Sequence, residues 1–90
     1  MFSLYIIKSI NKDYNYLGVT NNLERRLKDH NAGINKSTKP YKPFLLACKG
    51  EYKTLSEARK REWFFKCTPE GGKLKRKILN IAGVAAPDGA

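Results

Sequence analysis

The pattern of apolar and polar residues predicts three strands, two near the start of the chain and one near its middle. Residues 3–9 form a short run rich in apolar and β-branched side chains, which is typical of a strand. Turn residues follow at 11–13, and residues 14–19 then alternate aromatic with small or polar side chains, as an antiparallel partner strand would. After a polar loop at 35–43, a third strand is predicted from Phe44 to Cys48, with a continuation toward Tyr52.

Three other segments carry helix signals. Thr20 and Asn21 offer N-cap oxygens for a helix over 22–32, and Gly33 is a natural C-terminal stop. A second helix is predicted from Ser56 to Lys66 or Cys67, the Thr-Pro-Glu-Gly-Gly run at 68–72 should break it, and a last helix is predicted over 73–81. The order β-β-α-β-α-α predicts an α+β domain, in which about three helices flank a small three-stranded antiparallel sheet.

The length of 90 residues allows one small domain. We expect this domain to span residues 1–82, followed by a flexible tail at 83–90 that is rich in small residues. Because no window approaches the roughly 18 apolar residues of a membrane span, and the first apolar run lacks a basic lead-in, a cytoplasmic location is expected. Two cysteines, Cys48 and Cys67, are expected to be reduced structural thiols.

Charge changes the picture of what this domain binds. Lysine and arginine total 18 against 8 acidic residues, which gives a formal net charge of +10. Cationic side chains release condensed counterions from a phosphate backbone, so nucleic acid is the favoured partner. An anionic membrane surface is the rival, but it would call for a basic amphipathic helix with a broad apolar face. The charges instead spread along the whole chain, which favours nucleic acid.

A few residues combine into a candidate phosphodiester site. Arg26 and His30 lie four apart on the first predicted helix, so both can point to one side, whereas Arg25 points about 100° away from Arg26. On the second predicted helix, Glu57 lies in the first turn, where the helix dipole explains an acidic residue. Glu62 lies in mid-helix, where no capping role explains it.

The tripeptides Ser3-Leu4-Tyr5 and Tyr16-Leu17-Gly18, the run at 22–31 and the run at 57–62 together resemble the GIY-YIG nuclease family. The resemblance covers roughly residues 2–80. Both tripeptides depart slightly from the family pattern: Ser-Leu precedes the first tyrosine, and Leu stands in the middle of the second tripeptide. The chain is similar to the N-terminal nuclease domain of the incision subunit of nucleotide excision repair, and a small stand-alone member is expected.

The resemblance implies roles for five residues. Glu62 would bind Mg²⁺ or Mn²⁺, a hard cation that prefers oxygen ligands, and Arg26 would bind the scissile phosphate. Tyr5, Tyr16 and His30 would position or deprotonate the attacking water, and the sequence leaves open which of them takes the proton. Taken alone, the two tyrosines would be ordinary strand aromatics, and His30 would be a cation favoured at a helix C-terminus. No small-molecule cofactor is expected.

The expected function is a metal-dependent DNA endonuclease that acts in repair, recombination or processing of DNA. The alternative is a basic nucleic-acid-binding module without catalysis. Weak sequence preference is expected, with selection by DNA shape, branching or damage, or by a partner protein. Thr38 and Asn80 are left out of the site, because they could equally cap and turn. The residues expected to contact nucleic acid are Arg26, Asn31, Lys39, Lys42, Lys66 and Lys73.

Overall fold

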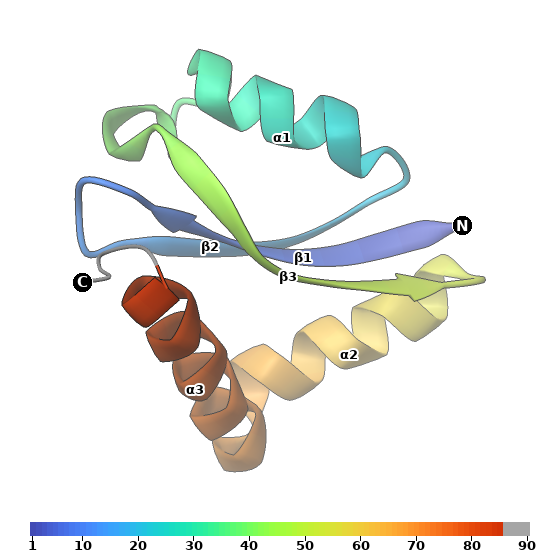
Figure 1. The fold of residues 1–90 in the computed structure, drawn as a ribbon. Helices are drawn as coiled ribbons and strands as arrows, with labels where there is room; N and C mark the ends of the chain where they lie inside the picture. The colour runs from blue at the N-terminus through green and yellow to red at the C-terminus, as the bar shows by residue number, and fades with distance from the viewer. Residues whose placement is uncertain (86–90) are drawn as a thin grey trace.

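Three strands and three α-helices follow one another in the predicted order β-β-α-β-α-α. The computed structural model describes the backbone of residues 1–85 and the side chains of residues 1–81 (Figure 1). A 3₁₀ turn, η1, lies within the polar loop predicted at 35–43. The elements are β1 (Phe2–Ser9), β2 (Asn15–Thr20), α1 (Leu23–Ala32), η1 (Lys39–Tyr41), β3 (Phe44–Tyr52), α2 (Leu55–Cys67) and α3 (Pro69–Ala85).

The three strands form one antiparallel sheet in the order β2-β1-β3, which confirms the predicted α+β class. The first strand along the chain is therefore the central one. In its register Tyr5 pairs with Gly18 of β2 on one side and with Lys49 of β3 on the other. β3 continues to Tyr52, as the sequence suggested, and its pairing with β1 shifts register between Ile6 and Ile7.

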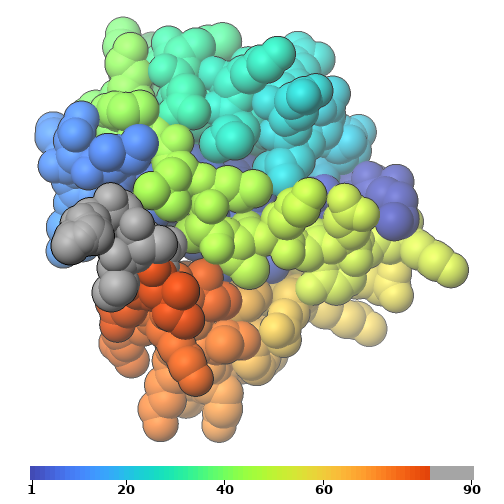
Figure 2. All heavy atoms as spheres, in the orientation of Figure 1, coloured from blue at the N-terminus to red at the C-terminus, as the bar shows by residue number. Residues whose placement is uncertain are grey.

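Helices cover both faces of the sheet, α1 on one side and α2 with α3 on the other (Figures 1 and 2). Alternate residues of β1 enter two separate cores because successive strand side chains point to opposite faces. Leu4 and Ile6 pack with Phe65 of α2 and Leu79 of α3. Tyr5 belongs to the other core, under α1. In the central strand, the catalytic candidate Tyr5 therefore lies between two residues of the main apolar core, Leu4 and Ile6.

The first helix begins one residue later than the sequence suggested. Its N-cap is Asn22, whose Oδ1 accepts a hydrogen bond of 3.1 Å from the Arg25 backbone N–H. The expectation that Thr20 and Asn21 supply the cap was wrong: the Thr20 hydroxyl oxygen instead accepts from the Asn22 N–H at 3.1 Å. Gly33 ends the helix with φ of 80°, which confirms it as the stop, because this backbone region suits glycine.

The junction between α2 and α3 differs from its prediction. The 68–72 run was expected to separate two helices, but α3 begins at Pro69, and the break is confined to Thr68. The hydroxyl of Thr68 donates to the Phe64 carbonyl at 2.7 Å and accepts from the Gly71 N–H at 3.0 Å, so one side chain joins both helix ends. A Cβ at Gly71 would overlap the Phe64 carbonyl oxygen. The glycine therefore permits close helix approach instead of breaking a helix.

The last helix is also longer than predicted, since it runs to Ala85 instead of about Ile81. Residues 83–85 of the predicted tail thus belong to α3, and residues 86–90 lie outside the described part of the chain. The division into a domain at 1–82 and a flexible tail stays a prediction. Within the described residues, no helix has both the length and the apolar character needed to cross a membrane.

Candidate active site

The two tyrosines of the candidate site meet over a glycine on β2. The side chain of Tyr5 crosses its register partner Gly18, where a Cβ atom would lie 2.7 Å from the Tyr5 phenolic oxygen. The same Cβ would lie 3.0 Å from Cε2 of Tyr16. Leu17, which lies between Tyr16 and Gly18 in the sequence, points to the opposite face of the sheet and is buried in the core under α2 and α3. The Tyr16-Leu17-Gly18 tripeptide therefore alternates one ring, one core residue and one gap that admits a second ring.

His30 lies at the centre of a buried polar chain. Its Nε2 is 3.1 Å from the Tyr5 phenolic oxygen, and its Nδ1 is 2.9 Å from the hydroxyl oxygen of Thr38. Both His30 and Thr38 are 0% exposed, and Tyr5 is 1% exposed. Burial, followed by the positive charge of Arg26, lowers the pKa of His30, so the ring is neutral at neutral pH. His30 does not meet solvent directly.

Arg26 lies one helical turn before His30 and is associated with both phenols. Hydrogen bonding to the Tyr5 phenol raises the pKa of Arg26, against the effect of burial, and Tyr16 adds to this rise. Burial raises the pKa of Tyr5, and the hydrogen bond from Arg26 offsets part of that rise. Tyr16 is half-buried, and its ring centroid lies 5.0 Å from that of His30. Of the two phenols, Tyr16 is the one that solvent can reach.

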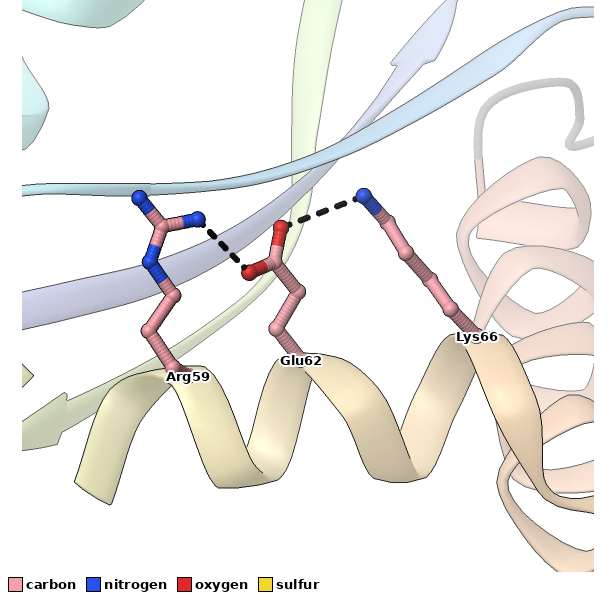
Figure 3. Close-up of polar contacts among 3 residues, drawn as sticks. All are labelled: Arg59, Glu62 and Lys66. Atoms are coloured by element: carbon pink, nitrogen blue, oxygen red, sulfur yellow. Dashed lines mark hydrogen bonds and ion pairs between the residues drawn. The ribbon is translucent and has the colours of Figure 1, made fainter. Parts of the chain in front are cut away.

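Glu62 approaches from α2, on the opposite side of the sheet from α1. Its carboxylate points from the helix toward the strands and is held by Arg59 Nη1 and Lys66 Nζ, each at 3.1 Å (Figure 3). Burial would raise the pKa of Glu62, but hydrogen bonds from Lys66 and Arg59 outweigh it and hold the pKa below its usual value. The charge of Glu62 makes a small contribution to the raised pKa of Tyr5, behind burial and the charge on Tyr16.

The donor chemistry of Glu62 fits a hard divalent cation. Mg²⁺ keeps several waters and is commonly held by one or two carboxylates together with a substrate phosphate. Glu62 is ionised, and its side chain is 14% exposed, so a cation could reach the carboxylate. Within the described residues, no group of three or more histidine, cysteine, aspartate or glutamate side chains gathers at one place.

The residues expected to contact nucleic acid have different surroundings. The Asn31 side chain bridges α1 to β3: its Oδ1 accepts from the Phe44 N–H at 2.6 Å, and its Nδ2 donates to the Phe44 carbonyl at 3.4 Å. Lys39 and Lys42 lie beside Gly33 at the end of α1. Lys66 is paired with Glu62, and Lys73 lies on α3 beyond the opposite face of the sheet. Their nucleic-acid contacts stay predictions.

Sequence reasoning missed two contributors to this site. Arg59 stands at i−3 from Glu62, and Lys66 stands at i+4, a spacing at which helical side chains meet, so Arg59 could have been found. Thr38 was left out as a turn residue. Its burial under His30 depends on how the 35–43 loop folds back on α1, and the sequence carries no local signal for that contact.

The fold and the arrangement of these side chains define a small nuclease-type domain. A family model described as the GIY-YIG catalytic domain matches residues 1–74, and the chain belongs to the GIY-YIG nuclease family. It is 37% identical over 73 residues to a UPF0213 protein of Staphylococcus haemolyticus, covering 80% of this chain and 88% of the relative. A UPF0213 protein of Vibrio campbellii is 36% identical over 79 residues, 87% of this chain and 72% of the relative. No solved structure matches.

Proposed function

We propose that this protein is a divalent-metal-dependent endonuclease that hydrolyses phosphodiester bonds in DNA. The observation that carries the proposal is the association of one guanidinium, Arg26, with the two phenols Tyr5 and Tyr16, near the ionised carboxylate of Glu62. A basic group beside a proton acceptor suits a reaction in which an anionic phosphate is attacked by water. The net charge of +10 favours the same class of substrate.

Each side chain has a separate task in this proposal. Arg26 binds a non-bridging oxygen of the scissile phosphate, because its guanidinium is permanently charged and donates in a fixed fork. Tyr16 first gives its own proton to solvent and then takes the proton of the attacking water as a phenolate, since it is the phenol that solvent reaches. Tyr5 holds Arg26 through a hydrogen bond, and the buried His30 in turn holds the Tyr5 phenol. Glu62 would hold the divalent cation, which would stabilise charge on the phosphate and on the leaving oxygen.

A nicking assay tests this assignment. Supercoiled plasmid is incubated with the purified protein in Mg²⁺, in Mn²⁺ and in a chelator. Glu62→Gln and Arg26→Ala should each lower the nicking rate by about 10²–10³-fold, as loss of one charge-stabilising group commonly does. Tyr16→Phe should abolish nicking as well. The matched controls are Arg25→Ala and Glu51→Gln, two exposed residues of the same types, and both should cleave at the wild-type rate.

The outcomes separate catalysis from binding alone. If wild type and both Glu62 and Arg26 variants nick equally, the assigned site is wrong. If the protein binds DNA in a salt-sensitive manner and shows no metal-dependent cleavage, it is a basic nucleic-acid-binding module instead. A panel of duplex, single-stranded, nicked, flapped and branched DNAs extends the assay to substrate structure.

We further propose that the enzyme selects DNA by structure, in repair, recombination or processing, with a partner protein available for targeting. A domain of this size offers little surface for reading base edges in the major groove, where sequence information lies. Recovery of one tight consensus from cleavage of random duplexes would contradict this part of the proposal.

A further inference from the structure

The buried polar chain of Tyr5, His30 and Thr38 continues into the loop before η1. There the Thr38 hydroxyl donates to the Asn35 carbonyl at 3.4 Å. The chain therefore links Tyr5, His30, Thr38 and Asn35 by contacts of 3.1, 2.9 and 3.4 Å. Tyr5, His30 and Thr38 are all at most 1% exposed, so each buried polar atom depends on its protein partner.

Each hydrogen bond in this buried chain is donated in the direction from Tyr5 to Asn35. Of the two partners of the buried Tyr5 phenol, only His30 Nε2 can accept its proton, because Arg26 can only donate. Nδ1 then carries the ring proton, and the Thr38 oxygen accepts from it at 2.9 Å. A neutral imidazole carries one N–H, which leaves Nε2 without a proton and able to accept from the Tyr5 hydroxyl. The phenolic oxygen of Tyr5 then presents its lone pairs elsewhere, toward Arg26, which can only donate.

The opposite tautomer would undo this arrangement. A proton on Nε2 would donate to the Tyr5 oxygen and turn the phenolic proton away from His30, toward the donors of Arg26. We propose that Thr38 is a positioning residue that fixes His30 with its proton on Nδ1 and so orients Tyr5 to accept a hydrogen bond from Arg26. The proposal rests on the proposed function for its catalytic consequence, but the tautomer itself is a property of the folded chain.

The chain's single histidine makes the tautomer directly measurable. Protein labelled with ¹⁵N-histidine gives one pair of ring nitrogens, and two-bond ¹H–¹⁵N correlations above neutral pH tell a protonated nitrogen from a bare one. Wild type should show Nδ1 protonated and Nε2 bare. Thr38→Val, which keeps the shape and removes the acceptor, should lose this preference, and Thr38→Ser should retain it.

Two results would overturn the proposal: a wild-type ring protonated on Nε2, or a ring in Thr38→Val that keeps the wild-type tautomer. The first needs no variant, so the proposal stays falsifiable even if Thr38→Val fails to fold. Single-turnover cleavage supplies the second readout. Thr38→Val should cleave about 10–100-fold more slowly because Arg26 is misplaced, and Thr38→Ser should cleave like wild type. If no protein cleaves DNA, the proposed function fails while the ring spectrum still decides the role of Thr38.

A second feature lies on the exposed side of α2. Trp63, the chain's one tryptophan, directly follows Glu62 and is 60% exposed. Residues three and four apart are neighbours on a helix surface, so Trp63 lies beside Arg59 and Lys66, the two cations that hold Glu62. Their side chains are 62% and 49% exposed. The indole is thus a large apolar surface set among positive charges at the edge of the candidate site.

We infer that Trp63 is a stacking platform for an unpaired base of the DNA strand that the site cleaves. Bases within a duplex already stack on one another, whereas an unpaired base offers its ring face to an aromatic side chain. Arg59 and Lys66 complement the phosphates on either side of such a base. The inference deepens the proposed function, since it assigns single-stranded, flapped or gapped DNA as the substrate class.

Intrinsic fluorescence tests this inference without cleavage, because all emission from tryptophan comes from Trp63. Oligothymidylate titrated in a chelator should quench the emission, and a hairpin duplex of equal charge should quench it much less. Trp63→Ala should bind oligothymidylate about 5–100-fold more weakly, in line with the loss of one stacked base. Trp63→Phe should keep most of the affinity. Equal quenching by duplex and single strand, or an unchanged affinity in Trp63→Ala, would refute the platform.

Discussion

A methyl group on Gly18 should disturb the candidate site and the fold together. In Gly18→Ala the new Cβ would lie 2.7 Å from the Tyr5 phenolic oxygen and 2.9 Å from its Cζ, where ordinary van der Waals contact begins at 3.4 Å. Tyr5 is 1% exposed, and its phenol is hydrogen-bonded to His30. Any shift of the ring that relieves the clash therefore disturbs this hydrogen bond.

The magnitude follows from three contributions. Overpacking a filled core costs about 1–3 kcal/mol, and a weakened hydrogen bond to His30 adds about 1 kcal/mol. Restriction of the unfolded chain by alanine returns about 0.4–1 kcal/mol. The free energy of unfolding should therefore fall by about 1–3 kcal/mol. With a urea m-value of about 1 kcal/mol/M, the unfolding midpoint should drop by about 1–3 M.

A double-mutant cycle checks the cause. In a Tyr5→Phe background the nearest clashing atom is absent, so Gly18→Ala should cost less there, with a coupling of at least about 0.5 kcal/mol. Gly72→Ala is the matched control, because a Cβ at Gly72 meets nothing within 4 Å. If Gly18→Ala is as stable as wild type, or costs the same in both backgrounds, the close approach of the phenol to Gly18 is not what requires glycine.

Three further changes have expected outcomes. Gly71→Ala should cost more than about 3 kcal/mol in urea unfolding, because its Cβ would overlap the Phe64 carbonyl oxygen and force α2 and α3 apart. Thr54→Ala should cost about 1 kcal/mol because it removes the N-cap of α2, and Thr54→Ser should restore the wild-type melting temperature. The pKa of His30 is lowered in the folded state, so the unfolded chain binds the proton more tightly. Wild-type stability should therefore decline as pH falls below about 6.5, and His30→Gln should lack that part of the decline in pH-dependent unfolding.

Much of the fold could be predicted because local patterns agree with it. A run of apolar and β-branched residues identified β1, alternation identified β2, and Gly33 marked the end of α1 because a positive φ suits glycine. The α2–α3 junction could not be predicted in the same way. Pro69, Gly71 and Gly72 are typical helix breakers, yet a proline suits the first turn of a helix. Gly71 is required because a Cβ at this position would overlap the Phe64 carbonyl oxygen of α2. That requirement exists only once both helices are packed.

The residues of the candidate site also divide into those that local sequence patterns could predict and one that depends on tertiary packing. Arg26, His30 and Glu62 could be proposed from helix position and family resemblance, because helical spacing fixes which residues share a face. The buried link through Thr38 could not, since a threonine among lysines and prolines reads as part of an exposed loop. Its side chain is buried because the loop folds over the end of α1, and this depends on contacts far apart in sequence.

The central position of β1 has a consequence for how this site can fail. Backbone amides of a strand that is paired on both edges and buried on both faces exchange with solvent only when the whole domain opens. Tyr5 belongs to that strand, so its phenol cannot be released by fraying of an end or by motion of a loop. Hydrogen exchange at the Tyr5 amide should report the global free energy of unfolding. Substitutions that displace Tyr5 by disturbing β1 should therefore appear in a screen as unstable proteins as well as inactive ones.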